Sequence, residues 1–197
     1  MKTLYIVSGH DLDSPPAIMR ERDTQGNFVI RPEIRHLACP NCGKLDEKAA
    51  LGLAVPRIRP IRTGRHIFPS FDELWIVQDV FRTALLRISS SEFQFTQIPS
   101  SPDFFVAVAL NGAKPVINDP GYRFLNQCKV CHRYEQILWG RAPITVPSSN
   151  AFQAIDLECR LGLAQVWLVQ SDVVEALSSH RPKLKGLVIS PKEVLQN

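Results

Sequence analysis

The sequence predicts an α+β fold, in which mixed sheets from two strand–helix–strand units are joined to a pair of cysteine knuckles. Two observations support this prediction: short apolar runs alternate with one-sided helical patterns, and two C-x-x-C pairs lie far apart in the chain. Of the 197 residues, 45% are hydrophobic and 21% are charged, as in ordinary soluble proteins. We expect one domain over residues 1–197, with one lobe (1–70 plus 99–150) around the cysteines and another (71–98 plus 151–197) built from the two units.

Before the second cysteine pair, β-favouring residues between turn signals predict strands over residues 4–7, 28–31, 74–77, 93–98 and 104–110. Apolar residues at helical spacing predict helices over 44–53 and through Val80, Ala84 and Leu85. Asn111 and Gly112 form a preferred two-residue hairpin turn, so a return strand is expected over 114–118. Two prolines predict a loop over 142–149.

A later stretch repeats an earlier one. Residues 167–177 (WLVQSDVVEAL) resemble residues 75–85 (WIVQDVFRTAL) when one residue is inserted. Each copy predicts a strand that begins with tryptophan and runs into a short helix, with Asp79 or Ser171 placed to cap that helix. A further strand follows each copy, over 93–98 or 186–189. The strands are apolar enough to be buried, which indicates a scaffold, in one sheet or in two.

The cysteine pairs are Cys39 with Cys42 and Cys128 with Cys131, and 85 residues (43–127) separate them. Two residues between cysteines let a tight turn aim both sulfurs at one point, and two such knuckles are typical of a four-thiolate zinc site. Gly43 follows the first pair, where the turn often needs positive φ. Four thiolates leave no open coordination position, so the predicted Zn²⁺ is structural.

The wide separation of the pairs is compatible with a metal staple. Closing an 85-residue loop costs about 4 kcal/mol of chain entropy plus a constant. Zinc binding supplies about 10–16 kcal/mol in small peptides, which exceeds that cost.

Three other interpretations of the cysteines remain open. The Cys39 pair could be a redox pair in a thioredoxin-like setting, although the second pair would then have no role. The second pair, followed by His132, matches the haem c attachment pattern, which requires export. The cysteines could also be buried or disulfide-linked without a metal.

Three further residues bear on the ligand set. His36 and His132 lie beside the pairs and could replace a thiolate, although a contact to the ligands or a surface position fits each of them better. Cys159 stands alone in an apolar stretch and is expected to be a small core residue.

Residues 55–66 hold four arginines and no acidic residue. Arg57, Arg59, Arg62 and Arg65 could form a basic edge that binds an acidic partner or phosphate. A solvated connection stiffened by prolines explains the stretch better, because no aromatic residues are interleaved in it.

Charge and targeting signals point to a cytoplasmic protein. The formal net charge of +4 is mild and does not by itself indicate nucleic acid. The apolar run at residues 1–7 is too short for a signal peptide, and no stretch approaches membrane-spanning length. Five cysteines, four of them in knuckles, fit a reducing compartment.

The two widely spaced C-x-x-C pairs and the final unit over 171–189 resemble the double-CXXCG-motif immunity proteins, which accompany polymorphic toxins in bacterial competition. Residues 155–157 (IDL) also match the lead into the last unit of that family. The likeness covers both knuckles and the last third of the chain. Two features differ: His132 stands where the family usually has glycine, and a glycine- and proline-rich stretch is reduced to 55–69.

The resemblance implies an antidote without enzymatic activity that binds a cognate toxin domain and blocks it. A zinc-ribbon protein that binds nucleic acid is the alternative, and the lack of basic–aromatic interleaving argues against it. The sequence contains no HExxH, GxSxG or phosphate-binding glycine motif. His10, Asp11 and Asp13 could bind a metal or act in acid–base chemistry, but a polar turn is the simpler interpretation.

Overall fold

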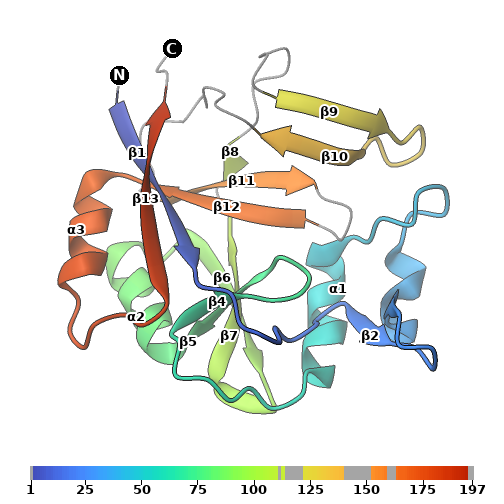
Figure 1. Cartoon of the computed structure of the whole chain (residues 1–197), viewed down its shortest axis with the longest axis horizontal. Coiled ribbons are helices and arrows are strands. Elements are labelled where there is room, and N and C mark those ends of the chain that lie inside the picture. Colours follow the sequence, from blue (N-terminus) through green and yellow to red (C-terminus); the bar gives the residue numbers. More distant parts are fainter. Residues whose placement is uncertain (1, 111, 114–121, 140–151, 159–162, 195–197) are drawn as a thin grey trace.

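The computed structural model describes residues 2–110, 112–113, 122–139, 152–158 and 163–194. It confirms the α+β class: three α-helices accompany two larger sheets and two small hairpins in this part of the chain (Figure 1). The expected return strand over 114–118 and the loop over 142–149 lie outside the described residues. Each helix in the described ranges is too short or too polar to cross a membrane.

The first sheet has five strands in the order β13-β1-β12-β11-β8. Neighbouring strands pair antiparallel, except that β11 and β8 are parallel, so this sheet is mixed. The strands are β1 (Lys2–Gly9), β8 (Gly112–Ala113), β11 (Phe152–Glu158), β12 (Leu163–Val169) and β13 (Leu187–Val194).

The second sheet has four antiparallel strands in the order β4-β5-β7-β6. These are β4 (Ile67–Pro69), β5 (Trp75–Gln78), β6 (Phe93–Ile98) and β7 (Ser101–Ala109). Its central strand β7 is almost continuously apolar because both of its faces are covered: Phe105, Ala107 and Ala109 lie toward one core, and Phe104 and Val106 toward the other.

The sequence repeat forms two units of the same topology, one in each sheet. In the first, β5 leads into α2 (Asp79–Ile88) and then β6, and β7 lies between the two strands. In the second, β12 leads into α3 (Ser171–Ser179) and then β13, and β1 lies between them. Each unit is therefore a βαβ crossover split by an antiparallel strand. The N-cap residues are Gln78 and Gln170, without a side-chain cap hydrogen bond, so the predicted caps at Asp79 and Ser171 were wrong by one residue.

One core lies between the two sheets and under α2 and α3. It joins β-strand residues of both units to helix residues, among them Val77, Phe81, Trp167, Val169 and Leu177. The backbones of the two sheets lie in close contact at Gly9 of β1, where an added Cβ would lie 2.7 Å from the carbonyl oxygen of Ile67. Only glycine permits this contact between backbones.

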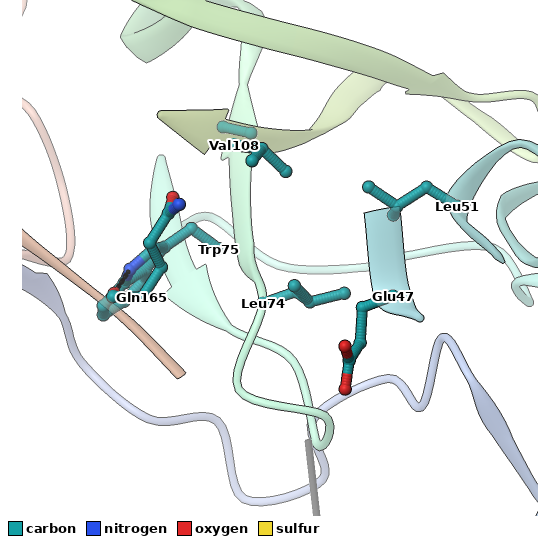
Figure 2. Close-up of a pocket in the computed structure, with 7 residues that line it drawn as sticks. Glu47, Leu51, Leu74, Trp75, Val108 and Gln165 are labelled. Atoms are coloured by element: carbon teal, nitrogen blue, oxygen red, sulfur yellow. Dashed lines mark hydrogen bonds between the residues drawn. The ribbon is translucent and has the colours of Figure 1, made fainter. Parts of the chain in front are cut away.

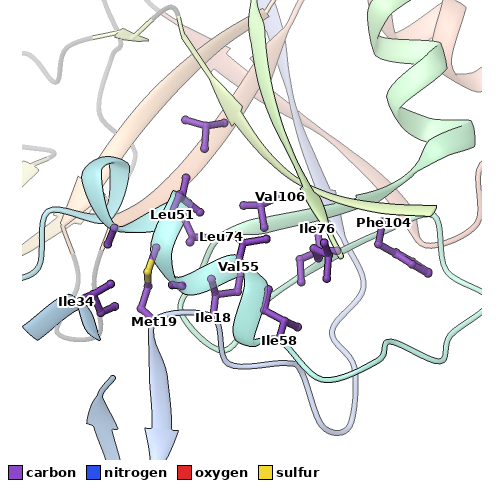
Figure 3. Close-up of a cluster of buried hydrophobic side chains, with 14 of the residues drawn as sticks. Ile18, Met19, Ile34, Leu51, Val55, Ile58, Leu74, Ile76, Phe104 and Val106 are labelled. Atoms are coloured by element: carbon purple, nitrogen blue, oxygen red, sulfur yellow. The ribbon is translucent and has the colours of Figure 1, made fainter. Parts of the chain in front are cut away.

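The other core lies between the opposite face of the second sheet and the N-terminal third of the chain (Figure 3). Here η1 (Pro32–Leu37), α1 (Glu47–Ala54) and η2 (Val55–Arg57) pack on the sheet beside the small hairpin of β2 (Arg20–Arg22) and β3 (Phe28–Ile30). Ile18, Met19 and Leu51 are buried in it. Asp46 caps α1 by accepting a 3.1 Å hydrogen bond from the amide of Ala49.

A second hairpin, β9 (Tyr122–Gln127) with β10 (Tyr134–Trp139), extends beside β11 and away from the two cores (Figure 1). The sequence analysis did not predict these strands. It also placed Gly112 in a hairpin turn, which was wrong: Gly112 lies in β8 and pairs in parallel with Ala154 of β11. The chain therefore leaves the second sheet after β7 and joins the first.

Candidate metal centre

The first cysteine pair lies in a tight loop between η1 and α1. The amide of Cys39 donates to the carbonyl of Lys44 at 2.8 Å, and the amide of Gly43 donates back to the carbonyl of Cys39, also at 2.8 Å. Gly43 has a φ of 72°, in the region that glycine enters without a steric cost. The loop folds back on itself, and both thiols of the pair reach one site with those of the second pair.

The second pair lies in the loop between β9 and β10 and has the same backbone pattern. The amide of Cys128 donates to the carbonyl of Arg133 at 2.8 Å, and the amide of His132 donates to the carbonyl of Cys128 at 3.0 Å. His132 has a φ of 58°, so it takes the position that Gly43 holds in the first loop. Histidine is among the residues that enter this region more often than most.

The fold brings the four predicted thiols together. The Sγ atoms of Cys39 and Cys128 are 3.9 Å apart, and those of Cys42 and Cys131 are 3.6 Å apart. All four sulfurs lie within 4.8 Å of one another, which places them within reach of one metal ion. These spacings are far longer than the roughly 2.05 Å of a disulfide, and the four residues are free cysteines.

Hydrogen bonds favour the thiolate form of Cys128. The backbone N–H of Cys131, the side-chain amide of Asn41 and the backbone N–H of Val130 lower the pKa of this thiol to about 6. The Asn41 Nδ2 and Val130 N atoms lie 3.3 and 3.4 Å from the sulfur. Asn41 belongs to the first loop and Cys128 to the second, so this contact joins the two knuckles.

The pKa values of Cys39 and Cys42 are shifted in opposite directions. Backbone N–H groups of Cys42 and Asn41 lower the pKa of Cys39. Desolvation of the sulfur raises the pKa of Cys42 to about 12, and neighbouring thiols add to the shift. Cys42 is the exposed member of the four as a residue, so the desolvation acts on its sulfur, which faces the other three cysteines. A divalent cation would compensate the negative charge and stabilise all four as thiolates.

A buried ion pair supports the metal centre from outside. Arg133 follows the second pair, and its Nη1 atom donates to the Leu45 carbonyl at 2.5 Å and contacts the Glu47 carboxylate at 3.2 Å. Both partners belong to the segment after the first pair. Burial raises the pKa of Glu47, while the charge of Arg133 opposes that shift. The arginine therefore fastens the β9–β10 loop to α1 independently of the sulfurs.

Glu47 also lines a cavity of about 10 Å³ between α1 and the sheets. Figure 2 shows Glu47 and Leu51 on one side of it, and Trp75 and Gln165 on the other. Such a volume holds about one water molecule.

The four arginines that the sequence offers as a partner-binding edge lie in different surroundings. Arg59 and Arg62 are exposed. Arg65 is half-buried and donates to the backbone carbonyl of Asp11, so it connects two loops. The backbone of Arg57 ends η2, and its side chain lies outside the described part of the structure.

The remaining candidates are not members of the four-sulfur cluster. His36 and His132 are exposed, and neither belongs to the four-cysteine group, which is the one metal-binding cluster found among the described residues. His10, Asp11 and Asp13 are exposed as well and form no such cluster. Cys159 lies outside the described residues.

Sequence reasoning missed Asn41, Glu47 and Arg133. Asn41 occupies one of the two variable positions inside the first C-x-x-C pair, and the motif assigns no role to them. Glu47 and Arg133 are 86 residues apart in the chain, so no local pattern signals their contact. A charged residue directly after each knuckle, Lys44 and Arg133, was the available signal.

Comparisons with protein-family models, with curated proteins and with solved structures found no match to this chain.

Proposed function

We propose that this chain is a cytoplasmic immunity protein that binds a cognate bacterial polymorphic toxin and occludes its active domain. The observation that carries the proposal is the meeting of the two C-x-x-C pairs at one site. The resemblance to the double-CXXCG-motif immunity proteins rests on these motifs, on the unit over 171–189 and on residues 155–157. The two motifs meet although 85 residues separate them, which supports the part of the resemblance that depends on them.

We further propose that the bound ion is Zn²⁺. Tetrahedral coordination with zinc–sulfur bonds of about 2.3 Å puts the sulfurs about 3.8 Å apart. The two measured spacings, 3.9 and 3.6 Å, lie on either side of this value. A site of four thiolates is coordinatively closed, so the role of the ion is to hold the β9–β10 hairpin to the N-terminal loop.

Zinc content tests the metal proposal. Elemental analysis of the purified chain is expected to give one zinc per chain, and Cys39→Ser or Cys128→Ser is expected to lose it. Cys159→Ser is the matched control, because this cysteine belongs to neither pair. Iron in place of zinc, or full zinc retention in both single variants, would contradict the proposal.

Co-expression tests the immunity proposal. The chain is expected to restore growth of cells that produce the toxin encoded beside it, and to co-purify with that toxin. Failure of both rescue and complex formation refutes the proposal. Salt-sensitive binding to nucleic acid without toxin binding would favour the zinc-ribbon alternative.

A further inference from the structure

A groove of about 730 Å³ opens beside the metal centre. Both cysteine loops and both strands of the β9–β10 hairpin contribute to its lining, so it exists only where the two knuckles meet. Its volume lies in the range of ligand sites, but its walls carry side-chain amides and charges instead of a mainly apolar surface. The lining residues are Asn41, Cys42, Lys44, Asn126, Gln127, Cys128, Arg133 and Glu135.

Two exposed apolar side chains lie on the same hairpin. Val130 is 58% exposed in the loop between Cys128 and Cys131, and Leu125 is 40% exposed on β9. Among the described residues, only four large hydrophobic side chains are this exposed, and these are two of them. The backbone amide of Val130 is directed at the Cys128 sulfur, which fixes the backbone of this residue in the cysteine loop.

The surroundings of the groove carry more positive than negative charge. Lys44 and Arg133 line it, of which Arg133 is already paired with Glu47, and Arg123 and Lys129 are exposed on the same hairpin. Glu135 is the one acidic residue in the lining, where it accepts a 2.7 Å hydrogen bond from Asn126. An acidic partner would complement this charge distribution.

We propose that this groove, together with Val130 and Leu125, is the surface on which a partner polypeptide docks. This inference rests on the proposed function and locates its interface. The occupant is an acidic segment of the partner: its carboxylates lie near Lys44, and an apolar side chain packs on Val130. The side-chain nitrogens of Asn41 and Gln127 donate to the Cys128 sulfur and the His132 carbonyl, so their side-chain oxygens accept from the backbone of the segment. Single-stranded nucleic acid fits less well, because none of the groove-lining residues is aromatic and available for base stacking.

Docking in this groove has a consequence for the metal. Cys42 is exposed and lines the groove, so a bound segment covers the most accessible sulfur. Partner binding is therefore expected to slow the transfer of zinc to a chelator. This readout uses the unaltered chain and does not depend on the folding of any variant.

Titration calorimetry with matched variants tests the location. The probe is a catalytically inactivated form of the toxin encoded beside this chain, added to the zinc-loaded full chain. Val130→Glu and Lys44→Glu are expected to weaken binding about tenfold or more. The controls are Leu53→Glu and Arg59→Glu, because both residues are exposed outside the groove; they are expected to bind as the wild type does.

The outcomes separate the inference from the proposed function. If the toxin binds and both groove variants bind it equally well, or if saturating toxin leaves the rate of zinc transfer unchanged, the groove is not the interface although the immunity function stands. Loss of binding in Arg59→Glu alone would move the interface to the arginine stretch. If the wild type binds no toxin, the proposed function fails and the interface fails with it. Weaker binding in both groove variants, with slower zinc transfer, supports the inference.

Discussion

Trp75 and Trp167 lie against each other, with ring centroids 5.6 Å apart, and they are the equivalent residues of the two sequence repeats. The two units therefore pack together through the residue that begins the repeated pattern. Helices α2 and α3 also contact each other. The repeat thus forms a scaffold in which two units of the same topology pack against each other.

Gln165 connects this tryptophan pair to both sheets. Its backbone carbonyl accepts from Trp75 Nε1 at 2.6 Å, and its side-chain Oε1 accepts from Trp167 Nε1 at 3.0 Å. The same side chain bonds the amide and the carbonyl of Ala109 at 2.8 and 3.1 Å. All of these contacts are buried or half-buried, where an unpaired polar group is costly.

We predict that Gln165→Leu lowers the free energy of unfolding by roughly 3 kcal/mol, because it leaves the Ala109 backbone and the Trp167 indole without this partner. Chemical denaturation in buffer that contains zinc measures the change. Gln94→Leu is the control: Gln94 is exposed on β6, and we expect a change within about 0.5 kcal/mol. Equal effects of the two substitutions would show that the Gln165 side chain does not join the sheets.

We predict that Arg133 and Glu47 are coupled in their contributions to the free energy of unfolding. Each single alanine substitution leaves the other charge in a largely buried position, whereas the double substitution removes both. In a double-mutant cycle, the double variant is therefore expected to be about 1–3 kcal/mol more stable than the sum of the single effects predicts. Denaturation curves at constant zinc occupancy give the four free energies.

The control cycle pairs Glu47→Ala with Lys129→Ala, an exposed position in the same loop. Coupling is expected to be near zero there. An Arg133–Glu47 coupling of the same size as this control would contradict a direct role for the ion pair.

The fold class and the residues of the four-cysteine cluster could be predicted from the sequence because their signals are local. A C-x-x-C pair and a tryptophan-led strand before a helix each lie within about a dozen residues. Gln165 and Ala109 are 56 positions apart, and nothing in the spacing of either residue signals their contact. The pairing of β8 with β11 also joins residues far apart in the chain, and no local pattern signals it. The local Asn111–Gly112 pattern predicted a hairpin turn instead.

The β9–β10 hairpin was missed for a different reason. Its sequence mixes apolar and polar residues on both strands, because the hairpin is packed only in part and leaves residues such as Leu125 exposed. Period-two alternation, the usual sequence signal of a half-buried strand, is therefore weak. The loop is held instead by the sulfurs and by Arg133, which act across long sequence separations.

Gly43 and His132 hold equivalent positions with positive φ, which predicts opposite responses to substitution. Gly43→Ala is expected to cost about 1–2 kcal/mol of stability, because a Cβ is strained in this conformation. His132→Gly is expected to leave stability unchanged or to raise it slightly, and to keep one zinc per chain. Thermal unfolding and elemental analysis measure both effects. Loss of zinc from His132→Gly would show that the imidazole is a ligand, contrary to the four-sulfur site.

The surroundings of His66 predict a pH dependence of the unfolding free energy that does not involve the candidate metal centre. Its Nδ1 atom accepts a 3.1 Å hydrogen bond from the amide of Lys185, and only the form with an unprotonated Nδ1 can accept it. Burial, together with the charges of Lys185 and His180, lowers the pKa of His66 below its ordinary value of 6.5. Because the folded-state pKa is depressed, this contribution to stability is present above pH 6.5 and is lost as the pH falls through the folded-state value.

We therefore expect the wild type to lose more unfolding free energy than His66→Asn between pH 7.5 and 5.5, a range of about one unit on either side of the ordinary histidine pKa. Asparagine keeps an acceptor in place of Nδ1 but does not titrate, so it isolates the ionisation from the hydrogen bond. Equal zinc occupancy in the two proteins is verified at each pH. An NMR titration of the His66 ring gives a direct check, because a folded-state pKa at or above 6.5 would exclude this origin for the pH dependence.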